Sequence, residues 1–183
     1  GAENYLGDGV SGIYLWGAQL EPGTATDYVR TVDVVGKDYG WYEPTEGTVF
    51  ASADKISDYA NSAIGSLEAD ANNIIAFGYR VGATASNTAS AWIRNAGATE
   101  LFRSDSNSYT GWKMSVGFKH NDANISVDGQ NYGAADTAVT LPTVSRLQIG
   151  RYATVTSYLN GHIKRLTYWP RRPADSTLQV ITQ

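Results

Sequence analysis

Apolar and polar residues alternate with a period of two along much of this chain. The stretch Trp112–Lys119 shows the pattern most clearly, because the residues at 112, 114, 116 and 118 are Trp, Met, Val and Phe. The positions between them hold Lys113, Ser115 and Gly117. Successive side chains of a strand point to opposite faces. We therefore predict a strand with one face buried and the other face in water.

Similar runs, rich in Val, Ile, Tyr, Trp and Thr, are separated by turn residues. They predict further strands at Ile13–Leu20, Gly47–Ala53, Ile74–Val81, Ser90–Asn95, Glu100–Ser104, Asn124–Val127, Arg146–Gly150 and His162–Trp169. Asp128-Gly129 follows one of these runs and predicts a tight hairpin turn. Many short strands with regular turns indicate an all-β sandwich or barrel rather than a parallel sheet.

Two segments carry helix signals. In 56–67 the apolar residues fall at helix spacing, but Ser, Asp, Asn and Gly fill the positions between them. These are poor helix-interior residues, so we expect a loop followed by a strand. Near the C-terminus, Asp175 or Ser176 can cap a short helix that runs through Leu178 and Val180.

The composition is that of a folded domain. The chain has 183 residues, of which 42% are hydrophobic and 17% charged, enough for one large sandwich or one domain plus a fragment. The formal net charge of −4 argues against nucleic-acid binding, which needs an excess of Lys and Arg. The absence of cysteine excludes disulfides and thiol catalysis. With no long apolar run we expect no membrane insertion, and the missing initiator Met leads us to expect a piece of a longer protein.

The first thirty residues differ from the rest. Residues Ser11–Gly23 read SGIYLWGAQLEPG, and Thr26-Asp27-Tyr28 follows them. This stretch resembles the closing strand of a β-sandwich carbohydrate-binding module that is common in phage structural proteins. The resemblance implies that residues 1–31 are the terminal fragment of a preceding module and a linker, and that residues 32–183 form the main domain.

A second resemblance covers the main domain. It rests on ISVDG at Ile125–Gly129, LQIG at Leu147–Gly150 and LNGHIKRLTYWPRR at Leu159–Arg172. These motifs are similar to those of laminin-G-like, concanavalin A-type lectin and glucanase domains of phage tail and prophage proteins. The resemblance implies a jelly-roll of two antiparallel sheets in a larger multidomain or oligomeric protein, at an extracellular or virion-associated location. Trp169, in its Tyr-Trp-Pro motif, is then expected in the core or packed between elements.

Signals for catalysis are weak. Glycosidases need two carboxylates across the scissile bond, and the E-x-D-x-E strand pattern of concanavalin A-type glucanases is missing; Glu68 and Asp70 share a parity but have no third acid. The nucleophile motif G-x-S-x-G is missing, and the two histidines, His120 and His162, lie far apart in sequence. The G-x-G-x-x-G of Gly7–Gly12 precedes a strand-like run instead of the helix that phosphate binding needs. We predict no enzyme; a polysaccharide hydrolase or lyase is the least favoured alternative.

Calcium is the one metal that the sequence makes possible. Oxygen-bearing side chains cluster at Asp105-Ser106-Asn107, Asn121-Asp122 and Asp136-Thr137, and hard cations favour such loops. The same residues are also ordinary turn formers, which is the favoured interpretation.

Carbohydrate binding has the strongest support. Sugars pack their C–H face on aromatic rings, while planar polar side chains reach the hydroxyls, and the chain has five Trp and twelve Tyr. In Ser90–Asn95, Ile93 and Trp92 lie on opposite faces. If Ile93 points into the core, Trp92 and Arg94 face solvent as a recognition surface. The alternatives are that Trp92 faces the core, or that it packs under a loop.

Four more residues are candidates for ligand contact. Tyr79 and Arg103 are expected on strands next to Trp92, and Tyr152 lies in the loop after Gly150. Trp41, at the entrance of the domain, either forms a surface platform or covers the open end of the core.

The function predicted is a non-catalytic carbohydrate-binding module that recognises a polysaccharide or cell-surface glycan. The alternative is a structural or assembly domain of a phage virion fibre. An exposed aromatic strip on one sheet favours the first, and a flat apolar patch favours the second.

Overall fold

The computed structural model describes residues 41–55, 62–79, 88–104, 111–152 and 158–183. All of them belong to one unit, Tyr39–Gln183. The strand expected at Ile13–Leu20 and the domain boundary expected after residue 31 lie outside the described residues and stay predictions. No helix in the described part of the chain is long and apolar enough to cross a membrane.

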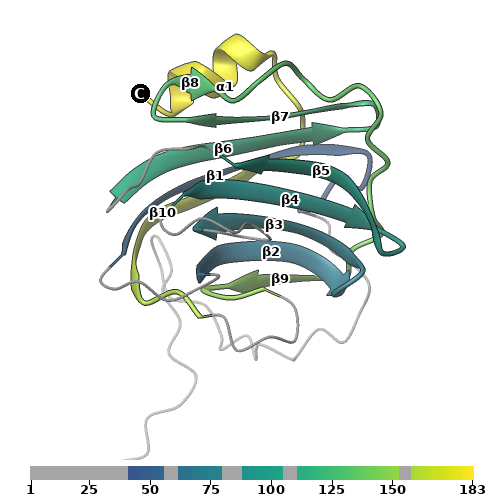
Figure 1. The fold of residues 1–183 in the computed structure, drawn as a ribbon, viewed down its shortest axis with the longest axis horizontal. Coiled ribbons are helices and arrows are strands. Elements are labelled where there is room, and N and C mark those ends of the chain that lie inside the picture. The colour runs from purple at the N-terminus through teal and green to yellow at the C-terminus, as the bar shows by residue number, and fades with distance from the viewer. Residues whose placement is uncertain (1–40, 56–61, 80–87, 105–110, 153–157) are drawn as a thin grey trace, which may run out of the picture. The chain divides into compact units, whose positions relative to one another are not determined.

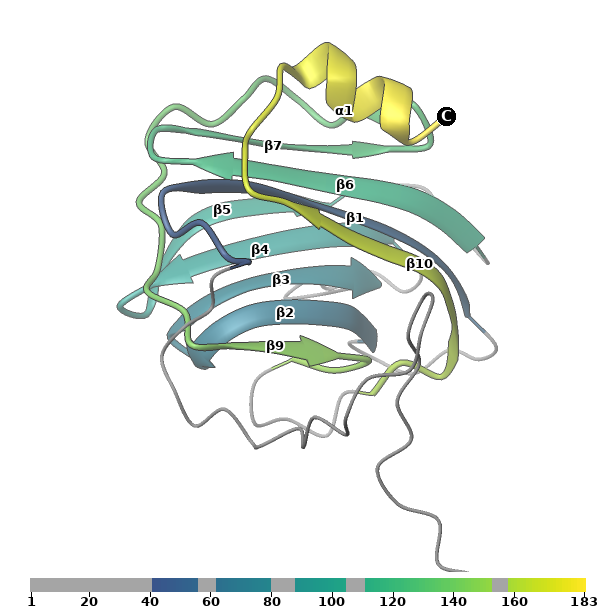
Figure 2. The ribbon, with the colours of Figure 1, turned by 180° about the vertical axis from the view of Figure 1, so that it is seen from behind.

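Two antiparallel sheets of five strands stack face to face (Figures 1 and 2). In spatial order the first sheet holds β10 (Gly161–Trp169), β1 (Glu46–Lys55), β6 (Gly111–Lys119), β7 (Asp122–Val127) and β8 (Gln130–Asn131). The second sheet holds β5 (Ala98–Ser104), β4 (Ala89–Asn95), β3 (Asn73–Tyr79), β2 (Ser62–Asp70) and β9 (Arg146–Ile149). A short helix, α1 (Asp175–Ile181), follows the last strand. The predicted all-β antiparallel sandwich with a short C-terminal helix is confirmed.

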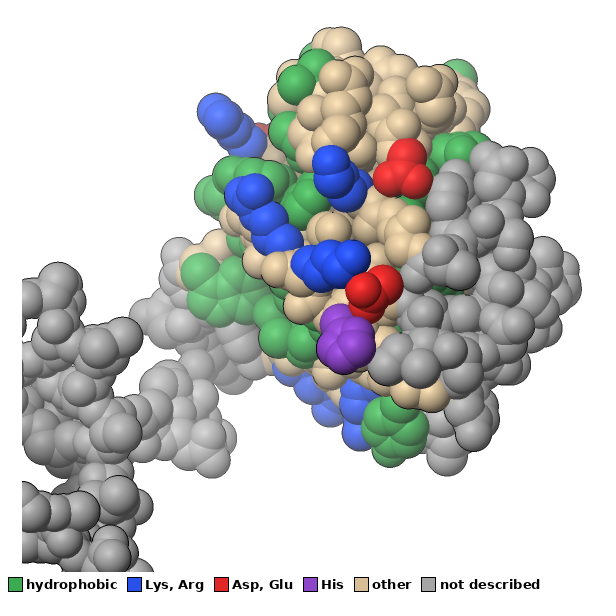
Figure 3. Space-filling model, turned by 90° about the vertical axis from the view of Figure 1, so that its left-hand side faces the viewer, with side chains coloured by type: hydrophobic (Ala, Val, Ile, Leu, Met, Phe, Trp, Pro, Cys, Tyr) green, Lys and Arg blue, Asp and Glu red, His purple; other side chains and the backbone are tan. Residues whose placement is uncertain are grey.

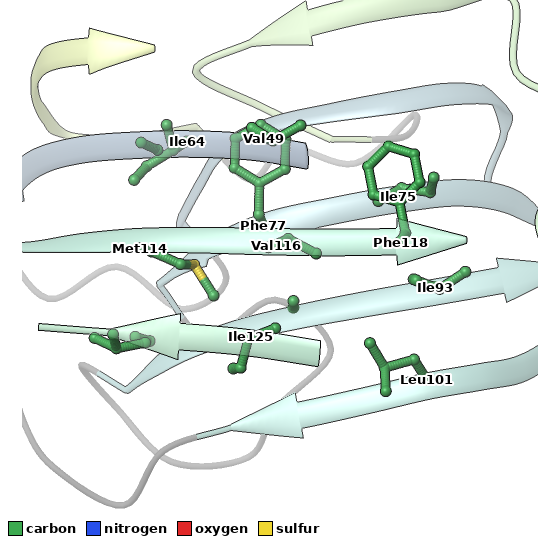
Figure 4. Packing of buried hydrophobic residues seen from close by; sticks show 14 of the residues in the cluster. Val49, Ile64, Ile75, Phe77, Ile93, Leu101, Met114, Val116, Phe118 and Ile125 are labelled. Atoms are coloured by element: carbon green, nitrogen blue, oxygen red, sulfur yellow. The ribbon is translucent and has the colours of Figure 1, made fainter. Parts of the chain in front are cut away.

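The core fills the space between the two sheets. Ile75 and Phe77 of β3 and Ile93 of β4 point inward toward Val116 and Phe118 of β6 (Figure 4), and each of these five side chains is at most 1% exposed. Full burial of such a side chain is worth about 1.5–3 kcal/mol. The two-residue period thus determines which side chains of each strand point into the core between the sheets.

Each of the eight strands predicted between residues 47 and 169 overlaps a strand of the structure. The strand expected at the end of 56–67 is β2, whereas residues 56–61 lie outside the described part. Asp128 and Gly129 have φ of 46° and 79°. Positive φ at both central residues defines a type I′ turn, so the predicted hairpin turn between β7 and β8 is confirmed.

The prediction that the second face of β6 is in water is wrong for most of the strand. Ser115 and Gly117 are buried, because α1 lies over β6 and β7 (Figure 2). The Ser115 hydroxyl donates to the carbonyl of Leu178 at 3.2 Å. A short helix thus gives the first sheet a second, smaller buried face.

The start of α1 also differs from its prediction. The N-cap position is Ala174, which makes no side-chain capping bond, and Asp175 is the first helical residue. The Asp175 carboxylate instead accepts a hydrogen bond from the Asn124 amide at 2.8 Å and pairs with Arg172. Asp175 therefore ties the helix to β7 rather than capping it.

Replacing Gly117 with alanine should lower the melting temperature. A Cβ atom there would lie 2.7 Å from Cδ of Arg172 and 3.1 Å from Cδ1 of Leu178. Overpacking of this kind costs about 1–3 kcal/mol. The matched control is Gly111→Ala in the same strand, where a Cβ meets nothing closer than 3.5 Å. Equal melting temperatures of the two variants in circular dichroism would contradict this packing.

Candidate functional site

Trp92 stands on the outer face of the second sheet. Ile93 is 0% exposed and points into the core, whereas Trp92 and Arg94 are partly exposed on the other side of β4. The predicted orientation of this strand is confirmed. Of the interpretations open for Trp92, a core position is wrong.

Neighbouring side chains fix the Trp92 ring. The indole Nε1 donates to Thr99 Oγ1 at 3.2 Å, and the Arg94 guanidinium lies over the ring, 4.9 Å from its centroid. Phe102 of β5 pairs in register with Trp92 and is 37% exposed. Two aromatic residues therefore lie opposite each other on adjacent strands, and the ring of Trp92 is held in place by a hydrogen bond.

Arg94 makes hydrogen bonds that the sequence did not predict. Its Nε and Nη2 donate to the carbonyl of Gly97 at 3.3 and 2.7 Å, and Nη1 donates to the carbonyl of Ala71 at 3.0 Å. These bonds commit the guanidinium to the backbone of two hairpin turns. Arg94 therefore positions the indole and connects the two turns; three of its five N–H groups are used in these bonds, and its contact with a ligand stays a prediction.

Small, buried side chains form the middle of this outer face, where Ala76 and Ser66 are both 0% exposed. In register with Trp92 across the sheet lie Ala76 of β3, Ser66 of β2 and Gln148 of β9. Ala76 belongs to a second apolar cluster, against which Trp92 packs and which also contains Tyr152, 7% exposed. The structure thus brings together Trp92 and Tyr152, which are sixty positions apart in sequence.

A buried carboxylate lies on the β2–β9 side of the same face. Glu68 is 0% exposed and accepts hydrogen bonds from Ser66 Oγ at 2.7 Å and from Arg146 Nη2 at 2.8 Å. The Gln148 amide also donates to it. The side chain of Arg146 is 47% exposed, so one side of this network reaches solvent. The sequence signal for it is the polar alternation of Arg146 and Gln148 in a short strand.

An unused hydroxyl lies near Trp92. Ser90 precedes Trp92 by two positions, faces the same way and is 0% exposed. Its Oγ has no hydrogen-bond partner, whereas Ser104, opposite Ser90 on β5, donates to Thr88 at 3.1 Å. A buried polar group without a partner is costly. Ser90 is therefore a buried hydroxyl for which the described residues supply no hydrogen-bond partner.

Two of the candidate residues do not lie on this face. Tyr79 is 1% exposed in the core, its ring 4.9 Å from that of Trp112, and burial raises the pKa of its hydroxyl. Arg103 pairs with the inward-facing Ala91 and lies 3.6 Å from Asp136. Both lie on strands next to β4, as expected. Their parity, however, puts their side chains on the inner side of these strands, away from the Trp92 face.

Trp41 lies at one end of the sandwich. It is 44% exposed, and its ring meets that of Tyr168 edge-on, with centroids 5.3 Å apart. Tyr42 and Tyr168 pack against the core, and burial raises the pKa of both their hydroxyls. Trp41 therefore packs on the residues that close this end of the core and keeps an exposed part, which is compatible with both interpretations.

The acids of the described calcium candidates are paired with arginines. Asp122 pairs with Arg172 at 2.9 Å, and Asp136 pairs with Arg103. Within the described part of the chain, no three His, Cys, Asp or Glu side chains come together. The Asp105–Asn107 candidate lies outside that part.

Solved structures share the fold, while no protein-family model and no curated protein matches the chain. The CBM40 domain of a Ruminococcus gnavus IT-sialidase, bound to α2,6 sialyllactose, aligns with a TM-score of 0.58 and 13% identity, covering 77% of this chain and 85% of that one. Domain 4 of AbnA, a GH43 extracellular arabinanase from Geobacillus stearothermophilus in complex with arabinotriose, aligns with a TM-score of 0.58 and 9% identity, covering 79% and 69%.

A Trypanosoma rangeli sialidase aligns with a TM-score of 0.55 and 13% identity, covering 76% of this chain and 23% of its own. This chain therefore spans about a quarter of that sialidase. At these identities the likeness establishes the β-sandwich fold, which this chain shares with domains solved in complex with sugars.

Proposed function

We propose that this chain is a non-catalytic carbohydrate-binding domain, and that a glycan lies on the outer face of the second sheet beside Trp92 and Phe102. The observation that carries the proposal is the pair of rings in register on β4 and β5, one of them anchored by Thr99. Such a surface suits the C–H face of a pyranose.

Polar groups on the same face supply what a sugar needs besides a ring. Arg146 extends from the Glu68 network with its side chain half exposed, and Gln148 lies beside it. Guanidinium and amide groups are among the side chains that bind sugar hydroxyls.

Two glutamates of the second sheet are engaged by the protein's own groups, which supports a role without catalysis. Glu68 is buried and held by Arg146, and Glu100 accepts the backbone N–H of Thr140 at 2.9 Å. Glycosidases instead hold two carboxyl groups across a scissile bond. The sugar complexes of the CBM40 domain and of domain 4 of AbnA add support, since both proteins use a comparable sandwich. A place in a larger extracellular or virion-associated protein is part of the same proposal.

A second candidate function is that of an assembly domain in a fibre. It rests on β9, an edge strand of the second sheet, where Leu147 is 38% and Ile149 is 59% exposed. An exposed apolar edge strand is a template for pairing with another chain.

Affinity electrophoresis of the folded chain through gels containing a panel of polysaccharides tests both candidates. A sugar-binding domain is retarded by at least one glycan class, and Phe102→Ala weakens that retardation at least about threefold. The control is Tyr158→Ala, which removes a more exposed ring, 56% against 37% for Phe102, from outside strands β4 and β5. No retardation of a folded chain, combined with self-association in sedimentation velocity, would favour the assembly domain instead.

A further inference from the structure

A trough runs between α1 and β10 on the outer face of the first sheet. It consists of two adjoining hollows of about 190 and 170 Å³, and both are lined by Trp169 and Ile181. Thr48, Arg171, Pro173 and Thr177 complete the first hollow, and Phe50 and Arg165 complete the second. Either hollow far exceeds the 10–15 Å³ that one water molecule needs. We call this feature the α1–β10 trough.

The trough exists because the helix covers the first sheet incompletely. Leu178 of α1 packs over Gly117 of β6, but the outer side chains of β1, Thr48 and Phe50, remain as a floor between the helix and β10. Trp169 pairs in register with Thr48 and points to this outer face. A core position, one of the two expected for Trp169, is therefore wrong; its neighbour Tyr168 packs against the core instead.

Each hollow has an arginine of its own. Arg165 lies over the Phe50 ring, 5.4 Å from its centroid, and its Nε donates to Thr167 Oγ1 at 3.1 Å. Its two terminal nitrogens have no hydrogen-bond partner in the described part of the chain. The side chain of Arg171 likewise makes no ion pair there, while its carbonyl accepts the Thr48 hydroxyl at 2.8 Å. Two guanidinium groups are thus available to an anion.

The charge around the trough is opposite in sign to that of the chain. The chain has a net charge of −4, yet Lys113 and Lys164 share the outer face of the first sheet with the two arginines. Figure 3 shows Lys and Arg side chains grouped on the side of the molecule where β10 lies. Two acids share this face: Asp54 is paired with Lys164 at 3.1 Å, and the carboxylate of Glu46 accepts the backbone N–H of Arg172 at 2.9 Å, so the cations outnumber the acids. The local field therefore favours a negatively charged ligand.

We propose that the α1–β10 trough is a second binding site, and that its ligand is a segment of an acidic polysaccharide. Two hollows in a row, each with an arginine, match a ligand that repeats a charged ring. The indole of Trp169 offers an apolar surface to the ring, and a guanidinium binds carboxylate or sulfate through two parallel hydrogen bonds. This site lies on the first sheet, and it does not depend on Trp92 or on the proposal made for the second sheet.

The test is affinity electrophoresis of the full chain with matched charged and neutral probes. The probes are polygalacturonate with its methyl ester, and dextran sulfate with dextran. We expect at least one acidic polymer to retard the chain, and added salt to weaken this retardation. Any retardation by the neutral counterpart should be unaffected by the trough variants. The proposal is overturned if the folded chain is retarded by neither acidic polymer, or if Trp92→Ala abolishes the retardation while all trough variants keep it.

Thr177→Glu is the sharpest variant. Thr177 is exposed on α1 and lines the trough, and an acid in the first turn of a helix does not destabilise it. We expect at least about tenfold weaker retardation, because a carboxylate inside the trough repels the polyanion. Ser176→Glu places the same charge one residue away, outside the trough lining, and should bind as the unmodified chain does. Equal losses in the two variants would show a diffuse charge effect and refute the site.

Two further variants locate the contacts. Trp169→Ala should weaken retardation at least about tenfold. Arg171→Gln should weaken it about threefold to tenfold, whereas Lys119→Gln, which removes one exposed charge away from the trough, should change it less than twofold. If Arg171→Gln and Lys119→Gln behave alike, the arginine does not bind the ligand.

Discussion

Arg172→Met should lower the free energy of unfolding by about 2–4 kcal/mol. The Arg172 side chain is 2% exposed, and its Nη2 binds both Asp122 and Asp175. Its Nη1 also donates to the carbonyl of Pro173. Methionine fills part of the volume but leaves the two carboxylates without their cation. Because Asp122 and Asp175 are 43% and 31% exposed, water partly replaces the lost partner, which keeps the cost below that of a fully buried pair.

Arg171→Met is the matched control for stability. Arg171 is the preceding residue, is exposed and makes no ion pair in the described part of the chain, so its replacement should change the free energy of unfolding by less than about 0.5 kcal/mol. Urea unfolding followed by tryptophan fluorescence measures both variants. Since domains of this kind are stable by about 5–15 kcal/mol, the expected loss is easily resolved. Similar midpoints for the two variants would show that Arg172 does not anchor α1 to the first sheet.

Trp92→Ala should weaken retardation by the glycan that the chain binds at least about tenfold, while the chain stays folded. The indole is the part of the outer face that both stacks and is held rigid, through Thr99 and Arg94. A ring that is already ordered loses little entropy on binding. Affinity electrophoresis with the retained polysaccharide gives the dissociation constant, and circular dichroism checks the fold.

Trp92→Phe separates stacking from hydrogen bonding. Phenylalanine keeps an aromatic face but has no N–H for Thr99, so we expect an intermediate loss of affinity. If Trp92→Ala binds as tightly as the unmodified chain, the ring is not part of the site. If Tyr158→Ala weakens binding more than Trp92→Ala does, the site lies toward the β9 edge.

The sandwich follows from the sequence because burial on one face leaves a period of two that is visible in a single strand. Ile75, Phe77, Ile93 and Leu101 all follow it. The same parity also predicts the direction of two candidate side chains, because Tyr79 shares it with Phe77 and Arg103 shares it with Leu101. Both therefore point inward, as the structure shows.

The rest of the site depends on strand order, which a local pattern does not contain. Tyr152 meets the Trp92 cluster, and Arg146 meets Glu68, because β9 pairs with β2 although the two strands lie far apart in the chain. The burial of Ser115 and Gly117 likewise depends on where the C-terminal helix packs. The hydrogen bonds of Arg94 likewise depend on the backbone of two turns. The alternation within one strand predicts on which face of the sheet a side chain lies, whereas the residues that it contacts depend on the order of the strands.

The most direct test of the central claim is NMR observation of the tryptophan indole N–H signals, assigned by Trp→Phe variants, during titration with the retained glycan. Five tryptophans are present, and Trp112 in the core serves as an internal reference. Our account predicts a saturable shift of the Trp92 signal with the dissociation constant found by electrophoresis, while the Trp112 signal stays in place. A glycan that binds and leaves the Trp92 signal unmoved would contradict the claim that the outer face of the second sheet is the carbohydrate-binding surface.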